Sequence, residues 1–136
     1  MIVLDSSFLI GFYNARDAHH NAASMLMSRF LAGEWGRGLL LEYVFLEVTT
    51  VIQLRRDHQS AAQVGRILLQ AQELDFVPCS DLFPHTLKIF LTQTNMRLSF
   101  ADAAIVYLVR QRAKGLILSF DTELMGTAGI QAAGFP

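Results

Sequence analysis

The fold is decided by the stretch Met1-Ile2-Val3-Leu4-Asp5-Ser6-Ser7-Phe8-Leu9-Ile10, which opens the chain. Its first four residues predict a strand buried on both faces, because apolar and polar side chains do not alternate. Asp5 then stands at the carboxyl end of that strand, which is where open α/β sheets place their ligands. Asp and Ser are also favoured helix N-cap residues, so the stretch by itself leaves a helix cap as an alternative.

Three further apolar runs, at residues 39–41, 75–79 and 116–118, predict more strands. Pro78 cannot donate a ladder hydrogen bond, so the second of these runs is expected at an edge of the sheet. Helices are expected between the strands, at residues 17–31, 42–56, 60–74, 81–93 and 100–113, with a short helix and a marginal last strand after residue 121. This alternation predicts one α/β domain over residues 1–136 with a parallel sheet.

The amino-acid composition indicates how the protein associates and in which compartment it acts. Only 17% of the 136 residues are charged, against roughly 25% in typical domains, which predicts an apolar face for self-association. The single cysteine, Cys79, excludes an intramolecular disulfide and fits a reducing compartment. No basic segment precedes the first apolar run, and no run approaches the roughly 20 apolar residues of a membrane span. We therefore expect a soluble cytoplasmic protein that does not bind membranes.

Two of the predicted helices carry an acid on the face expected to be buried. Glu47 lies at helical spacing from four apolar residues, Tyr43, Val44, Val51 and Leu54. Asp102 shares a face with Leu98 and Ile105, although Ser99 and Asp102 also match a capping box loosely. An acid on a buried face is costly unless it is paired or binds a cation. Both positions therefore indicate a site, and a capping role for Asp102 stays open.

Four acids are expected to meet at one edge of the sheet: Asp5, Glu47, Asp102 and Asp121. Carboxylates that meet within one cleft repel one another by several kcal/mol at an effective dielectric of about 20, so they must take up protons or bind a hard cation. Ligands that are all oxygen favour Mg²⁺ or Mn²⁺ over zinc. The adjacent His19 and His20 point to different faces of a helix and are expected to be structural or solvent-facing.

The remaining charges favour a phosphate partner. Removing the four acids from the 12 acidic residues leaves eight against 11 basic residues, of which nine are arginine. A negative metal pocket within an arginine-rich surface suits a phosphate backbone. Metal ions in such a pocket can activate water for phosphodiester hydrolysis. These features predict a metal-dependent nuclease or phosphohydrolase.

Five short motifs follow one another along the chain in an order that is typical of one family: Asp5-Ser6-Ser7, Asp17-x-x-His20, Phe45-Leu46-Glu47-Val48, Ser99-Phe100-Ala101-Asp102-Ala103 and Ser119-Phe120-Asp121. This order resembles the PIN domain family, and most of all its short, free-standing VapC-type toxin ribonucleases. The resemblance covers essentially the whole chain. Its most specific part is the order of the four acids on these elements.

The resemblance implies a three-layer α/β/α sandwich around a short parallel sheet, and an endoribonuclease that cleaves single-stranded RNA with Mg²⁺ or Mn²⁺. By position, the metal ligands and catalytic acids would be Asp5, Glu47, Asp102 and Asp121. Ser119 matches the hydroxyl that supports the last acid, and Ser6 matches the hydroxyl after the first. A cognate antitoxin is the protein partner expected for the toxin of a toxin–antitoxin pair. Independently of the resemblance, the low charge fraction and the apolar helices predict a homodimer, formed through the helix at 81–93 or the one at 60–74.

Two departures from the family pattern bear on the site. Glu42 stands where the family commonly has a small hydroxyl residue, so an extra acid could join the cluster. The tail after Asp121 is short, which affects the geometry of the fourth acid and the last strand.

Other functions remain as alternatives. An aspartate-nucleophile phosphatase needs a second acid where Ser7 stands, and a phosphoacceptor domain needs a lysine near Ser119. A degenerate PIN-like module that only binds RNA or a protein is disfavoured because all four acids are present. The RNA target is not encoded by any local motif.

Overall fold

The computed structural model describes residues 1–127 and 129–134. Its five strands form one sheet in the order β3-β2-β1-β4-β5, and every neighbouring pair is parallel. The strands are β1 (Ile2–Leu4), β2 (Gly38–Leu41), β3 (Leu74–Val77), β4 (Leu116–Leu118) and β5 (Gln131–Ala132). The opening stretch of the sequence therefore supplies the central strand, and the strand that ends near Pro78 lies at an edge, as predicted.

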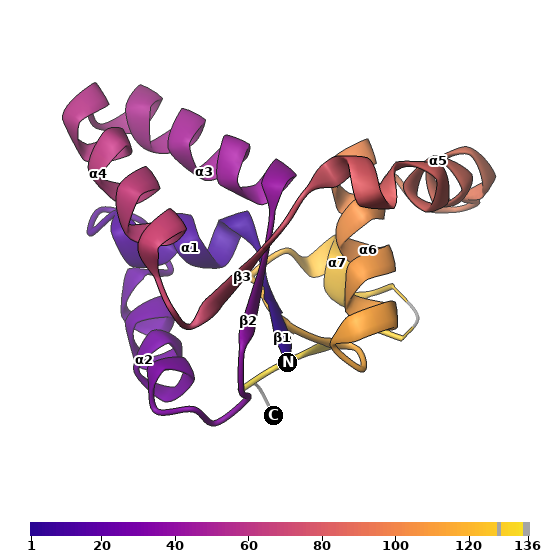
Figure 1. Ribbon diagram of the computed structural model, residues 1–136, viewed down its shortest axis with the longest axis horizontal. Coiled ribbons are helices and arrows are strands. Elements are labelled where there is room, and N and C mark those ends of the chain that lie inside the picture. The colour runs from indigo at the N-terminus through magenta and orange to yellow at the C-terminus, as the bar shows by residue number, and fades with distance from the viewer. Residues whose placement is uncertain (128, 135–136) are drawn as a thin grey trace.

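Helices cover both faces of the sheet. They are α1 (Ser6–Tyr13), α2 (His20–Leu31), α3 (Glu42–Arg55), α4 (His58–Gln70), a 3-10 helix at Cys79–Leu82, α5 (Phe83–Thr92), α6 (Phe100–Arg112) and α7 (Thr122–Met125). Helices α1 to α4 lie on one side of the sheet and α5 to α7 on the other (Figure 1). The three-layer α/β/α arrangement is thus confirmed. None of the described helices has the length and apolar character needed to cross a membrane.

The core is built on the two central strands. All three residues of β1 are buried, and the three leucines of β2 are buried as well. Both faces of these strands are apolar because α1 and α3 pack on one side while α6 packs against β1 on the other. This packing, together with the pairing of β1 with β4, determines where the two strands end and therefore where the residues that follow them lie.

Several helices differ from the prediction. The helix expected at 60–74 is α4, which begins at His58, with Asp57 as its N-cap, and ends at Gln70. The segment 6–13 forms α1 directly after β1, with only Asp5 between them, whereas no separate helix was expected there. Helix α2 begins at His20 rather than at residue 17. The reason is that the Asp17 carboxylate accepts the backbone N–H of His19 in a turn, so it does not cap the helix. The helix expected at 81–93 is divided into the 3-10 helix and α5.

The buried face of α3 also differs from the prediction. Val44, Val48 and Ile52 form it, at intervals of four residues, while Leu54 is 79% exposed. The predicted stripe was right for Val44, and Tyr43 and Val51 are partly buried against the core, but it was wrong for Leu54. Glu47 consequently lies beside the buried face, and its side chain is exposed.

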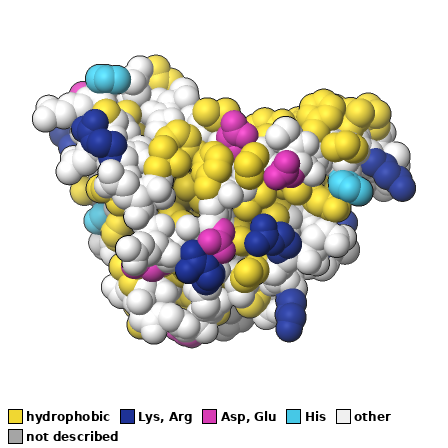
Figure 2. Space-filling view, viewed as in Figure 1, with side chains coloured by type: hydrophobic (Ala, Val, Ile, Leu, Met, Phe, Trp, Pro, Cys, Tyr) yellow, Lys and Arg dark blue, Asp and Glu magenta, His cyan; other side chains and the backbone are white. Residues whose placement is uncertain are grey.

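Apolar side chains gather on α5. Phe83, Leu87, Phe90 and Leu91 are all exposed on this helix. Figure 2 shows hydrophobic side chains gathered over the arm where Figure 1 places α5.

Candidate active site

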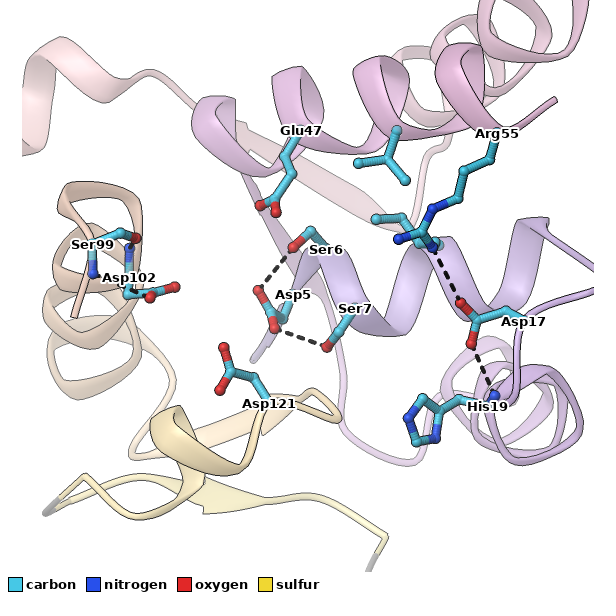
Figure 3. A pocket seen from close by; sticks show the side chains of 12 residues that line it. Asp5, Ser6, Ser7, Asp17, His19, Glu47, Arg55, Ser99, Asp102 and Asp121 are labelled. Atoms are coloured by element: carbon cyan, nitrogen blue, oxygen red, sulfur yellow. Dashed lines mark hydrogen bonds and ion pairs between the residues drawn. The ribbon is translucent and has the colours of Figure 1, made fainter. Parts of the chain in front are cut away.

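A cavity of about 360 Å³ lies at the carboxyl ends of β1 and β4 (Figure 3). Its lining comes from α1, α3, the start of α6, the loop between α1 and α2, and the residues that follow β1 and β4: Asp5, Ser6, Ser7, Ile10, Asp17, His19, Glu47, Val51, Arg55, Ser99, Asp102 and Asp121. The structure therefore brings the four acids singled out in the sequence to one cavity. Ser6 lines it too, while Ser119 lies buried behind Asp5.

Asp5 is the most deeply placed of the acids, with 2% of its surface exposed. Its Oδ2 atom accepts hydrogen bonds from the hydroxyls of Ser119 at 2.7 Å and Ser7 at 3.0 Å. Asp5 is the N-cap residue of α1, as the capping alternative expects, but its side chain forms no N-cap hydrogen bond to that helix. Burial raises the pKa of Asp5 in spite of these hydrogen bonds, and the nearby charge of Asp121 adds to the rise.

The same two hydroxyls tie the ends of β1 and β4 together. Ser7 Oγ accepts the backbone N–H of Phe120 at 2.9 Å, and Ser119 Oγ accepts the backbone N–H of Asp121 at 3.0 Å. Ser119 thus supports the last acid through its backbone while donating to the carboxylate of the first. The sequence did not single out Ser7, since nothing local shows that a hydroxyl two residues after an acid reaches across to another strand.

Asp102 serves two purposes. Ser99 Oγ accepts the N–H of Asp102 at 3.0 Å, and Asp102 Oδ2 accepts the N–H of Ser99 at 3.3 Å, which completes the capping box of α6. The half-buried side chain also lines the cavity. Burial first, and then the charges of Asp121 and Glu47, raise the pKa of Asp102. The capping box is therefore confirmed, and the same carboxylate also lines the cavity.

Asp121 and Glu47 complete the acidic end. Asp121 Oδ1 accepts the N–H groups of Glu123 and Leu124 and so caps the short helix α7. Glu47 extends from α3 toward Ser6 and Asp5 (Figure 3). The electrostatic effects of Asp121 on two other acids, and of Glu47 on Asp102, show that the four negative charges act on one another.

Glu42 does not belong to this cluster. Its Oε1 atom accepts the backbone N–H of Cys79 at 2.8 Å, which turns the side chain toward the start of the 3-10 helix. It does not line the cavity.

Burial raises the pKa of the Cys79 thiol to about 11, so the thiol stays protonated and is no nucleophile.

The other end of the cavity carries Asp17, His19 and Arg55. Arg55 Nη1 lies 3.8 Å from Asp17 Oδ2, and Asp17 Oδ1 accepts the N–H of His19 at 2.9 Å. The His19 ring stacks on Phe120, with 4.3 Å between ring centroids. His20 instead has its Nδ1 atom 2.9 Å from the Gly11 carbonyl oxygen, a structural contact. The sequence did not predict this end, because its residues come from the loop between α1 and α2 and from the far end of α3.

The donor set of the acidic end fits a hydrated divalent cation. Carboxylate and hydroxyl oxygens surround it, and burial first, with a smaller effect of the neighbouring acids, raises the pKa of Asp5 and of Asp102. Among the described residues, no three acidic, histidine or cysteine side chains lie close enough to form a coordination shell by themselves. Mg²⁺ commonly keeps several waters and contacts only one or two carboxylates, so widely spaced acids suit it.

Comparisons with known proteins agree with this geometry. The family model of the PIN domain matches residues 2–129. The crystal structure of Mycobacterium tuberculosis VapC20, described as a sarcin–ricin loop cleaving toxin, is similar with a TM-score of 0.83 and 21% sequence identity over 96% of this chain and 97% of that one. No match was found among curated protein sequences. With a family match over nearly all of its length, and with the fold and the order of acids that the sequence predicts, the chain belongs to the PIN domain family.

Proposed function

We propose that the protein is an endoribonuclease that hydrolyses single-stranded RNA with the help of Mg²⁺ or Mn²⁺. The observation that carries this proposal is the convergence of Asp5, Glu47, Asp102 and Asp121 on one cavity. Membership of the PIN domain family and the structural likeness to a toxin that cleaves RNA support it. A module that only binds RNA or a protein finds no support in a cavity that keeps all four acids.

The acids would hold the metal, and the surrounding hydroxyls would hold the acids. A bound divalent cation lowers the pKa of water and offsets negative charge on the phosphate. Ser7 and Ser119 donate to Oδ2 of Asp5 at 3.0 Å and 2.7 Å, whereas Ser6 donates to Oδ1 at the longer distance of 3.5 Å. Oδ1 would therefore be the atom more readily available to a ligand. In the reaction the oxygen of water bonds to phosphorus and the bond from phosphorus to the 3′ oxygen breaks. The products are a 5′-phosphate and a 3′-hydroxyl.

A cleavage assay tests this function. Purified protein is incubated with mixed RNA in Mg²⁺, in Mn²⁺ and in excess chelator, and the product ends are determined. We expect cleavage only with the metal, and 5′-phosphate ends. Cleavage that persists in chelator, or 2′,3′-cyclic phosphate ends, would instead indicate metal-free attack by the ribose hydroxyl and rule the proposal out.

We also propose that the protein acts in the cytoplasm as a homodimer and is restrained by a cognate antitoxin. The exposed apolar residues of α5 support self-association, since a contiguous apolar surface of this kind is unusual on a monomer. Helix α4, the other contributor predicted, exposes Ile67 and Leu69. Light scattering at micromolar concentration checks the dimer, and a monomeric mass would contradict it.

A further inference from the structure

Helix α3 gives the cavity two ends of opposite charge. Glu47, Val51 and Arg55 follow one another at intervals of four residues, and all three line the cavity. They therefore form one stripe along the helix, with Arg55 about 12 Å from Glu47 at 1.5 Å per residue. Figure 3 shows Glu47 extending toward Asp5 and Arg55 extending toward Asp17.

Arg55 also connects the cavity to a second hollow. This hollow, of about 170 Å³, is lined by Arg16, Arg55, Arg56 and Asp57. The Asp57 carboxylate already accepts the N–H of Ser60 at 2.6 Å as the N-cap of α4. The surface therefore leads from the acids, past Arg55, to a group of three arginines.

We propose that Arg55, with Arg16 and Arg56 beyond it, binds phosphates of the RNA strand that flank the scissile one, and that Asp17 holds Arg55 until RNA replaces it. This inference rests on the proposed function. Guanidinium groups suit phosphate oxygens because their donors form a planar fork. Since Arg55 lies two helical turns from Glu47, it faces a flanking phosphate and not the bond that is cut.

The pair between Arg55 and Asp17 is built to be exchanged. Its closest atoms are 3.8 Å apart, and 59% of the Arg55 side chain is exposed. By contrast, Arg37 donates two hydrogen bonds to Asp75, at 2.6 Å and 2.9 Å, and is committed to that carboxylate. The Asp17 side chain is only 16% exposed, but a pair this long with an exposed guanidinium is weak, so a phosphate that approaches Arg55 competes with Asp17 at little cost.

Binding in chelator tests the phosphate site without cleavage. A short fluorescent oligouridine is titrated by anisotropy at several salt concentrations, with Arg55→Gln compared with Arg66→Gln. Arg66 is a matched control because it is exposed on α4 and lines neither hollow. We expect Arg55→Gln to weaken binding about tenfold and to lower the salt slope by about one ion. The control should bind like wild type, and equal effects in the two variants would overturn the site.

Asp17→Asn tests the competition. Asparagine keeps the oxygen that accepts the N–H of His19, so the turn is preserved while the charge is lost. We expect RNA to bind about two- to fivefold more tightly, as for release of an exposed ion pair. The gain should vanish when Arg55→Gln is also present. An equal gain in both backgrounds would mean that Asp17 acts only through its long-range charge, against the proposal.

The two proposals fail in different ways. A wild-type protein that neither cleaves nor binds RNA refutes the proposed function. A wild-type protein that cleaves with metal, while Arg55→Gln and Arg66→Gln bind oligouridine equally, refutes only the arginine site.

Discussion

Asp5 shows how a carboxylate is kept in a buried position that opposes its charge. Burial raises its pKa, but the hydroxyls of Ser119 and Ser7 each donate to Oδ2 and recover part of the lost solvation. Both hydroxyls also accept backbone N–H groups after β4, so their orientation is determined from two sides. The position of this acid therefore depends on the packing of two strands.

Asp102→Asn separates the capping role from the site role. Asparagine can still accept the N–H of Ser99, so the helix cap should survive. Loss of the charge relieves repulsion from Asp121 and Glu47, and in chelator we expect the variant to be as stable as wild type or more stable, by on the order of 1 kcal/mol after allowance for solvent screening. Mg²⁺ should reverse the order, because wild type binds it better.

Thermal melting of both proteins, in chelator and in Mg²⁺, measures this difference. RNA cleavage should also fall sharply in the variant. Melting shifts that run in parallel, together with undiminished cleavage, would reduce Asp102 to a helix cap.

The raised pKa values predict how stability depends on pH in chelator. Burial raises the pKa of Asp5 and Asp102 above 3.8, so the folded protein binds protons at these groups more tightly than the unfolded chain. Stability should therefore increase as pH falls from neutrality through the raised values toward 3.8. At lower pH, Asp75 loses the stabilisation that Arg37 provides, because that pairing lowers the pKa of Asp75.

Thermal melting of the protein in chelator, at pH values from about 7 to about 4, measures how its stability depends on pH. Asp5→Asn cannot take up the proton and should lose part of the increase. An identical slope in the variant would show that Asp5 carries no uncompensated charge.

At the scale of elements, the apolar runs predicted the strands well, because a strand covered on both faces needs no polar alternation. The end of α6 and its capping box were also predictable from local residues. The buried face of α3 could not be predicted, because Val44 and Leu54 are both apolar and only packing against neighbouring elements decides which of them is buried. Likewise, the turn at Asp17 depends on a hydrogen bond to His19 that competes with helix capping.

Gly38 at the start of β2 gives a test of how closely the layers pack. An added Cβ would lie 2.6 Å from Leu74 Cδ2, 2.7 Å from Phe30 Cζ and 2.9 Å from Leu4 Cδ1. Gly38→Ala should therefore destabilise the protein by about 1–3 kcal/mol. Gly65→Ala in α4 is the matched control, because the added Cβ would lie no nearer than 3.5 Å to its neighbours Phe45 and Thr49 of α3.

Helix propensity should make Gly65→Ala neutral or stabilising, by up to about 1 kcal/mol. Urea unfolding of the two variants provides the comparison. Equal stability of the two would mean that β2 has room that the structure does not show.

At the scale of the whole molecule, the sequence located the four acids because Asp5 and Asp121 follow apolar strands, and Glu47 and Asp102 lie among the apolar residues of two predicted helices. It did not locate Ser7, Asp17 or Arg55, whose contacts join residues distant in the chain. Nor could it decide the place of Glu42, because a side chain at a helix start can turn toward either neighbouring loop. The acidic end was thus predictable from local order, and the arginine end became visible only in three dimensions.

The most direct test of the acidic site is the rate of RNA cleavage in saturating Mg²⁺ by Asp121→Asn and Glu42→Gln. Both substitutions remove one charge and keep a hydrogen-bond acceptor, at the cap of α7 in one case and for the N–H of Cys79 in the other. We expect Asp121→Asn to lose more than about 100-fold, since even partners outside the metal ligands cost 10–100-fold. Glu42→Gln should cleave near the wild-type rate, and Asp121→Asn cleaving as fast as Glu42→Gln would contradict the account.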